Sequence, residues 1–177
     1  MLELLNSMGS DICLEENGML TIDSSNLTNP EARYELVKTM RASILVMGPL
    51  LAKYGRAKIS QPGGCNIGTR PIDFHLSGLE QMGAEIKIDS KFIYLEAKKL
   101  RPIDFSFPKI SVTGTENLIM AAIFTPGVTN LKNCAKEPEV VDLINFLNSC
   151  GAKIEGAGTS NISITGVEDL VLSLIHI

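Results

Sequence analysis

The 177-residue sequence contains no tryptophan, and aromatic residues make up only 5% of it. Its core must therefore be built mainly from aliphatic side chains, which suits a total of 45% hydrophobic residues. Runs of lysine and arginine are also lacking, and the net charge is −4. These features argue against a nucleic-acid partner and against a membrane surface as partner. They are compatible with a small anionic substrate, which needs only a few well-placed cations.

Long hydrophobic runs are absent as well. The longest apolar stretch, residues 42–52, is interrupted by Gly48 and Pro49, whereas a membrane-spanning helix needs about 20 residues. The first residues carry no basic segment and no small-residue cleavage site, so we expect no signal peptide.

The four cysteines lie far apart and form no Cys-X-X-Cys pair or Cys/His cluster. A zinc site and a disulfide framework are therefore not expected, and this favours a reducing, cytoplasmic location. We interpret Cys13, Cys134 and Cys150 as small buried side chains. Cys65 is different because of its neighbours, which are described below.

The most informative pattern is an internal repeat. Three segments, residues 2–9, 76–83 and 144–151, end in a glycine that follows aliphatic residues four and seven positions earlier. This spacing is typical of one buried stripe on a helix, and the glycine suits a left-handed C-terminal cap. An isoleucine follows three residues after each glycine and opens a pair of short strands. The sequence thus predicts a helix followed by a β-hairpin, three times along the chain. The expected hairpins pair residues 12–14 with 19–22, 86–88 with 92–95, and 153–154 with 162–164.

Between these units the pattern predicts a second helix and a strand. The helices are expected at residues 34–47 and 116–124, and the strands at 56–60 and 128–131. The first unit contains only its last helix and its hairpin. Because a domain that began inside a unit would leave an apolar face uncovered, we expect the chain to be a fragment.

The stretch best suited to chemistry, residues 61–73, joins a predicted strand to a predicted helix. Its glycines allow sharp turns and hold Cys65 on a loop. Arg70 precedes Pro71 at the expected start of the helix, where free N–H groups and the helix dipole favour anions. These neighbours would lower the pKa of the Cys65 thiol and make it a nucleophile or a proton donor. The alternative is a small buried side chain.

Two further segments are candidate anion-binding sites. Lys38 and Arg41 lie three residues apart on one predicted helix. We expect Lys38 on a solvated face, while Arg41 faces either solvent or a cleft. Residues 109–116 lead into the next helix with hydroxyls and a glycine that could donate to phosphate oxygens, or they form an ordinary threonine-capped helix start. His75 and His176 have no partner at metal-ligand spacing, and we assign them no role.

Five segments together resemble the UDP-N-acetylglucosamine enolpyruvyl transferase family. The resemblance extends from Met1 to about Leu170, and the loop Pro62-Gly63-Gly64-Cys65 is its most specific part. It implies an α/β fold, the enolpyruvyl transferase-like inverse α/β barrel built of βαβαββ repeats around a pseudo-threefold axis, here with the first repeat truncated. The matching segments are Tyr34 to Ser43, Pro62 to Cys65, Arg70 to Asp73, Gly78 to Glu80 and Glu137 to Asp142.

The resemblance also implies an activity. Members of the family transfer the enolpyruvyl group of phosphoenolpyruvate to the 3′-hydroxyl of UDP-N-acetylglucosamine, which is the first committed step of peptidoglycan synthesis. They have two similar domains with the active site in the cleft between them, and they require no metal or organic cofactor. We therefore expect residues 1–170 to form one incomplete domain that lacks its second-domain partner and has no turnover alone. Residues 171–177 do not continue the family pattern, which suggests a non-native tail.

Carried over by position, Cys65 matches the family's loop cysteine. That cysteine is the proposed general acid toward the enolpyruvyl methylene, forms an adduct with phosphoenolpyruvate, and is alkylated by fosfomycin. Arg41 and Arg70 match arginines that hold substrate phosphates, a role that suits the bidentate guanidinium. Residues 70–74 and 109–112 match segments that line the nucleotide site, with Phe74 where leucine is commoner. The implied substrate-binding residues are thus Arg41, Arg70, Pro71, Ile72, Asp73, Phe74, Lys109, Ile110, Ser111 and Val112.

Two alternatives stay open at the level of the sequence. A transferase like 5-enolpyruvylshikimate-3-phosphate synthase shares the fold and the donor but lacks the cysteine loop. A non-catalytic binding module built from the same repeats would make the cysteine incidental. The family's lysine–asparagine pair, which contacts phosphoenolpyruvate, and the catalytic aspartate of its second domain have no counterpart in this sequence.

Overall fold

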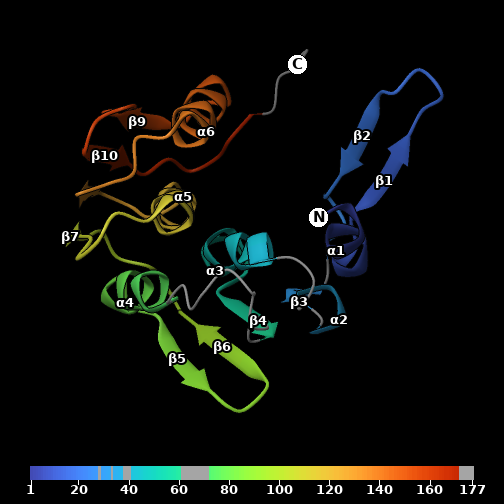
Figure 1. Ribbon diagram of the computed structural model, residues 1–177, viewed down its shortest axis with the longest axis horizontal. Coiled ribbons are helices and arrows are strands. Elements are labelled where there is room, and N and C mark those ends of the chain that lie inside the picture. The colour runs from blue at the N-terminus through green and yellow to red at the C-terminus, as the bar shows by residue number, and fades with distance from the viewer. Residues whose placement is uncertain (28, 33, 38–40, 61–71, 172–177) are drawn as a thin grey trace.

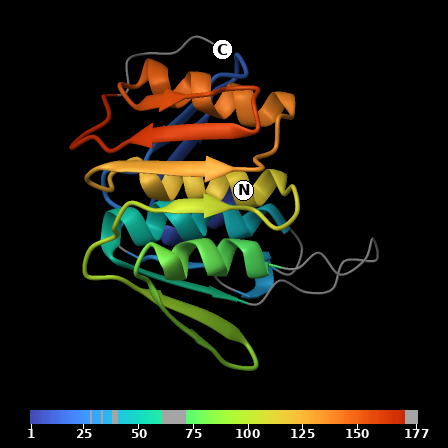
Figure 2. The same ribbon diagram turned by 90° about the vertical axis from the view of Figure 1, so that its left-hand side faces the viewer.

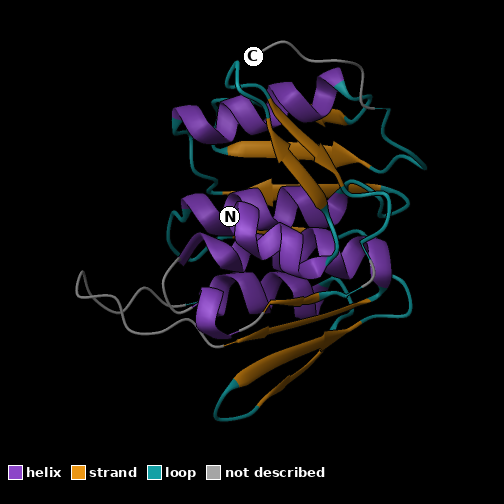
Figure 3. Ribbon diagram, turned by 90° about the vertical axis from the view of Figure 1, so that its right-hand side faces the viewer, coloured by secondary structure: helices purple, strands orange, loops and turns teal. Residues whose placement is uncertain are grey.

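A computed structural model of the chain describes residues 1–27, 29–32, 34–37, 41–60 and 72–171. Helices gather in the middle of the molecule, and the sheets lie around them (Figure 1). Colouring by secondary structure shows the same arrangement from another side (Figure 3). Helices inside and sheets outside are the layout of the predicted inverse α/β barrel.

The described residues form seven helical segments and ten strands. The helical segments are α1 (Leu2–Met8), α2 (Tyr34–Val37), the 3-10 helix η1 (Arg41–Val46), α3 (Met47–Tyr54), α4 (Asp73–Gln81), α5 (Val112–Ala122) and α6 (Pro138–Ser149). The strands are β1 (Asp11–Leu14), β2 (Leu20–Asp23), β3 (Glu31–Ala32), β4 (Arg56–Ser60), β5 (Glu85–Ile88), β6 (Phe92–Glu96), β7 (Asp104–Ser106), β8 (Val128–Lys132), β9 (Lys153–Glu155) and β10 (Asn161–Thr165).

The strands form one two-stranded and two four-stranded sheets. The four-stranded sheets have the orders β3-β4-β6-β5 and β7-β8-β10-β9, and β1 pairs with β2 alone. In each four-stranded sheet the first pair is parallel and the other pairs are antiparallel. Figure 2 looks onto the outer face of the second four-stranded sheet, with helices behind it. Two sheets of the same topology confirm the predicted repeat.

The predicted helix–glycine–hairpin units are confirmed in all three places. Gly9, Gly83 and Gly151 follow α1, α4 and α6 with φ values of 109°, 101° and 99°. These left-handed conformations turn the chain from each helix into its hairpin, and they suit glycine because it has no Cβ. The register also repeats, since Ile12 pairs with Ile22, Ile86 with Leu95, and Ile154 with Ile164.

The predicted helix over residues 34–47 is wrong at its C-terminal end. Helical structure continues through α3 to Tyr54, and Gly48 and Pro49 lie in the first turn of α3. A proline fits the first turn of a helix because the backbone N–H it lacks would have no partner inside the helix. A glycine is needed at position 48 because a Cβ there would overlap the backbone and side-chain oxygens of Asn117 on α5.

The helix predicted at residues 116–124 begins earlier, at Val112. Ser111 caps it by accepting a hydrogen bond from the Gly114 N–H at 3.2 Å. The cap is therefore a serine, and the first turn contains no acidic residue, in contrast to the threonine-capped start considered from the sequence.

The core lies between the helices and the inner faces of the sheets. Leu79 of α4 and Leu118 of α5 are fully buried, as are Ile93 and Leu131 of the two four-stranded sheets. Aliphatic side chains dominate this core, as the composition predicts. Phe105 and Phe107 add an edge-to-face ring pair with centroids 5.0 Å apart.

Three of the cysteines fall within the described residues. Cys134 and Cys150 are buried, as predicted, but the prediction for Cys13 is wrong because this side chain is exposed on β1. The strand pair that carries Cys13 stands apart from the rest of the molecule (Figure 1). None of the helices in the described ranges is both long and apolar enough to cross a membrane.

Candidate functional site

The loop with the predicted reactive thiol lies outside the described residues. This applies to Cys65, Arg70 and Pro71, and also to Lys38. Arg41 begins η1, but its side chain is not described. The structure therefore defines the frame of the site, which consists of the segments that flank these positions.

The first flanking segment is the start of α4. Asp73 opens this helix and is exposed, while Ile72 and Phe74 are half-buried and pack against the core. The two apolar side chains anchor the segment to the core. The carboxylate of Asp73 stays in solvent, where a ligand can reach it.

The second flanking segment is the start of α5. Lys109 and Ile110 are exposed, Ile110 by 55%, whereas Ser111 and Val112 are half-buried. Thr115 links the start of α5 to the segment before α6. Its hydroxyl donates to the Ser111 carbonyl at 2.8 Å and accepts from the Ala135 N–H at 3.1 Å. The exposed ammonium of Lys109 and the N-terminal dipole of α5 are suited to an anionic ligand.

His75 joins the starts of the two helices. Its Nε2 lies 3.3 Å from the Thr113 hydroxyl in the first turn of α5, and its Nδ1 lies 2.9 Å from the side-chain nitrogen of Asn117. Residues 72–74 and 109–112 therefore lie at the same end of two neighbouring helices. The structure brings together these two segments, which the resemblance assigns to one nucleotide site.

Asn117 extends the connection to η1 and α3. Its Oδ1 accepts from the Gly48 N–H at 2.6 Å, and its Nδ2 donates to the Ile44 carbonyl at 3.3 Å. Sequence reasoning missed both His75 and Asn117. A usable signal was present for His75, because it lies three residues after Ile72 and four residues before Leu79, on the apolar stripe of the predicted helix.

Two other side chains, Glu116 and Cys134, have raised pKa values. Burial, reinforced by the nearby carboxylate of Glu139, raises the pKa of Glu116 above the ordinary glutamate value. Burial also raises the pKa of the Cys134 thiol to about 11. Cys134 is thus a poor nucleophile. Within the described residues, no three His, Cys, Asp or Glu side chains gather so as to hold a metal ion.

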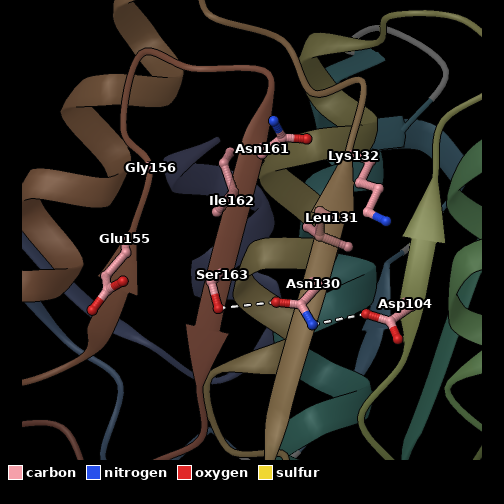
Figure 4. Close-up of a pocket in the computed structure, with 9 residues that line it drawn as sticks. All are labelled: Asp104, Asn130, Leu131, Lys132, Glu155, Gly156, Asn161, Ile162 and Ser163. Carbon is pink, nitrogen blue, oxygen red and sulfur yellow. Dashed lines mark hydrogen bonds between the residues drawn. The ribbon is translucent and has the colours of Figure 1, made fainter.

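The outer sheet faces carry two shallow hollows. One of about 350 Å³ lies on the sheet of β7 to β10 (Figure 4), where Asn130 donates to Asp104 at 2.7 Å and accepts from Ser163 at 3.0 Å. The other, of about 290 Å³, lies beside the Lys58–Glu31 ion pair of the other four-stranded sheet. Neither hollow is lined by a predicted site residue.

The fold agrees with the comparisons to known proteins. Residues 1–177 match the family described as EPSP synthase (3-phosphoshikimate 1-carboxyvinyltransferase). The chain belongs to this family, a family of enolpyruvyl transferases.

Several similar curated relatives share one name. The UDP-N-acetylglucosamine 1-carboxyvinyltransferase of Ruthia magnifica subsp. Calyptogena magnifica is 59% identical over 169 residues, which are 96% of this chain and 40% of the relative. The enzymes of that name from Hydrogenovibrio crunogenus and Coxiella burnetii are 53% and 52% identical, again over 96% of this chain and over 40% and 39% of their own lengths. The chain thus spans about 40% of the relatives it matches.

Solved structures confirm the predicted fold. The enolpyruvyl transferase NikO from Streptomyces tendae superposes with a TM-score of 0.75 at 21% identity, covering 93% of this chain and 39% of NikO. The EPSP synthase from Acinetobacter baumannii gives a TM-score of 0.71 at 19% identity, covering 96% of this chain and 39% of that enzyme. At these identities the likeness establishes the fold alone.

Proposed function

We propose that the chain is the cysteine-loop domain of a UDP-N-acetylglucosamine 1-carboxyvinyltransferase. In this function an enolpyruvyl group moves from phosphoenolpyruvate to the 3′-hydroxyl of UDP-N-acetylglucosamine, phosphate leaves, and the product enters peptidoglycan synthesis. One observation carries the proposal. Relatives that are 50–59% identical along 96% of this chain bear this name.

The residues take the roles that the resemblance implies. Cys65 supplies the proton that the methylene carbon of phosphoenolpyruvate takes up when the 3′-oxygen adds to the neighbouring carbon. Arg41 and Arg70 hold phosphate oxygens. Residues 72–74 and 109–112 line the nucleotide site, and the proximity of these two segments at one end of α4 and α5 supports this role.

The proposal includes an active-site cleft that is formed by two domains. Residues 1–170 supply one wall of the cleft, and a second domain of similar fold supplies the opposite wall, consistent with a chain that spans about 40% of its relatives. The chain alone then binds the nucleotide weakly and does not turn over. Phosphate release by the isolated chain at the rate of a two-domain enzyme would contradict this arrangement.

Calorimetric titration tests the choice of substrate. We expect the chain to bind UDP-N-acetylglucosamine and to bind shikimate 3-phosphate at least ten times more weakly, a difference of about 1.4 kcal/mol. The reverse preference would favour an EPSP synthase-like activity. Failure to bind either ligand would favour a non-catalytic module.

Thiol labelling tests the role of Cys65. The chain is treated with fosfomycin and UDP-N-acetylglucosamine, and the modified peptides are identified by mass spectrometry. The exposed Cys13 is a competing thiol, so the Cys13→Ser variant serves as the matched background. We expect modification of Cys65 that depends on the nucleotide. In the unmodified chain, equal labelling of Cys13 and Cys65 would remove the evidence for a special thiol.

A further inference from the structure

A buried polar cluster lies where α4, α5 and the junction of η1 with α3 meet. It consists of the side chains of His75 and Asn117, the hydroxyl of Thr113, and backbone groups of Ile44 and Gly48. Asn117 is 0% exposed and His75 is 3% exposed. Side chains this polar are seldom fully buried unless they make hydrogen bonds, because desolvation without a partner is costly.

The hydrogen bonds fix the orientation of both side chains. The Gly48 N–H can bond only to an acceptor, so the carboxamide oxygen of Asn117 must face α3. Its nitrogen then donates to the Ile44 carbonyl and to Nδ1 of His75. Because Nδ1 accepts, the neutral imidazole carries its proton on Nε2 and donates it to the Thr113 hydroxyl at 3.3 Å. Each polar atom of the two side chains thus has a defined partner.

The helical segments approach one another closely here, and two glycines lie at the contacts. A Cβ at position 48 would overlap oxygens of Asn117, and a Cβ at position 78 would overlap the side chain of Leu118. A displacement of one segment against another would therefore break hydrogen bonds of the cluster or press Gly48 against Asn117. The cluster sets one relative position of the three helical segments.

The anchor points of the cluster lie next to the predicted substrate-binding residues. His75 follows Phe74 directly, and Thr113 follows Val112 directly. Ile44 comes three residues after Arg41 in η1. A shift at any anchor point moves one of the three segments that carry the proposed site.

We propose that His75 and Asn117 are positioning residues of the substrate site: they hold Arg41, residues 72–74 and residues 109–112 in the geometry that binds the nucleotide. The inference rests on the proposed function and deepens it. Neither side chain needs to touch the substrate. Their effect is to reduce the number of arrangements that the three segments can adopt before the ligand arrives.

Variants that cut single links test the proposal. Thr113→Val replaces the hydroxyl with a methyl group, whereas Thr113→Ser keeps the hydroxyl. His75→Asn keeps a polar atom near the Nδ1 position and loses the hydrogen bond to Thr113. His75→Gln keeps a polar atom near the Nε2 position and loses the hydrogen bond to Asn117. We expect Thr113→Val and His75→Asn to raise the Kd for UDP-N-acetylglucosamine about fivefold, the value of one hydrogen bond. Thr113→Ser should restore the Kd of the unmodified chain.

A matched control comes from Asn148 on α6, whose side chain bridges to the backbone of Ile154 with two hydrogen bonds of 2.8 and 2.9 Å. Asn148→Ala removes comparable bonds in the third repeat, at residues that the site does not use. It should lower the thermal midpoint of unfolding and leave the Kd unchanged. If Thr113→Val and His75→Asn also leave the Kd within twofold of the unmodified chain, the positioning role is refuted.

Backbone amide chemical shifts give a readout that does not depend on binding. Thr113→Val should shift the amides of Phe74 and Ile44, which lie on other helical segments, whereas Asn148→Ala should leave them in place. If the unmodified chain does not bind the nucleotide, the proposed function is refuted, and these shifts still decide the inference. Shifts confined to α5 in Thr113→Val would overturn it.

Discussion

The hairpins β1–β2 and β9–β10 have the same register but differ completely in burial. Ile22 pairs with Ile12 as Ile164 pairs with Ile154. Nevertheless Ile164 is 1% exposed, and Ile22 is 45% exposed. In the second repeat the equivalent side chain, Leu95, is again fully buried.

The neighbours of the hairpins explain this difference. β10 pairs with β9 on one side and with β8 on the other, and β6 lies between β5 and β4 in the same way. β2 pairs with β1 alone within the described residues. A hairpin with an alternating sequence thus creates an apolar face, but only a third strand and helices packed behind it can bury that face.

The largest effect should come from truncating equivalent core positions. Ile164→Ala should lower the free energy of unfolding by about 2–5 kcal/mol, because it removes buried methyl groups and leaves a cavity. Ile22→Ala should cost less than about 1 kcal/mol, since solvent already reaches this side chain. Urea unfolding monitored by circular dichroism measures both changes. Equal losses would show that Ile22 is buried in solution by contacts absent from the structure.

Thiol reactivity should next separate the β1–β2 hairpin from the buried core. Cys13 is exposed on β1, whereas burial raises the pKa of Cys134 from 9.0 to about 11. The raised pKa leaves little thiolate on Cys134 at neutral pH, and burial slows access further. Under native conditions iodoacetamide should therefore modify the exposed Cys13 at least about tenfold faster than the buried Cys134, as measured by peptide mapping. In urea the two rates should converge, and a difference that persists there would point to another cause.

Turn glycines should give a smaller contrast. Gly18 and Gly156 have φ values of 85° and 90°, so alanine is strained at both positions. A Cβ at position 18 meets nothing within 4 Å, while one at position 156 overlaps the Asn161 carbonyl. Gly18→Ala should cost about 1–2 kcal/mol from backbone strain alone, and Gly156→Ala should cost more. If thermal unfolding ranks them in the opposite order, the close approach in the third hairpin is not present in solution.

The smallest effect should come from the polar side-chain pairs on the outer faces of the two four-stranded sheets. Lys58 and Glu31 form an ion pair of 2.8 Å that raises the pKa of Lys58, whereas the equivalent positions in the other sheet hold Asn130 and Asp104. Since both ion-pair side chains are one-third exposed, Lys58→Met should cost less than about 1 kcal/mol.

The pH dependence of this ion pair follows from the direction of the pKa shift. Because the pKa of Lys58 is raised in the folded state, the stabilisation is complete below the ordinary lysine value of 10.5 and is lost as the pH rises through the raised value. Chemical unfolding at pH 8 and above pH 10.5 should show this loss in the unmodified chain and not in Lys58→Met. The asparagine variant Asp104→Asn serves as the control, and its pH dependence in this range should match that of the unmodified chain.

Local patterns predicted much of the fold. The aliphatic stripes and terminal glycines located α1, α4 and α6, and the strand pairs that follow them were correctly placed. The end of α3 was missed because Gly48 and Pro49 usually interrupt helices, and the contact that favours glycine there involves Asn117, which lies 69 residues away. The motifs proposed the segments of the candidate site, but they did not reveal the hydrogen bonds of His75, since its partners are distant in sequence.

The sequence alone determined the repeat, the helix–hairpin units and the segments proposed to bind substrate, because each depends on residues within one or two turns of one another. Tertiary structure decided which apolar faces are buried and how the junction of η1 with α3 is joined to α4 and α5. Burial and hydrogen bonding between distant segments depend on which surfaces meet, and this is set by the packing of the whole chain. Ile22 and Ile164 occupy the same local pattern, and only their surroundings in the fold distinguish them.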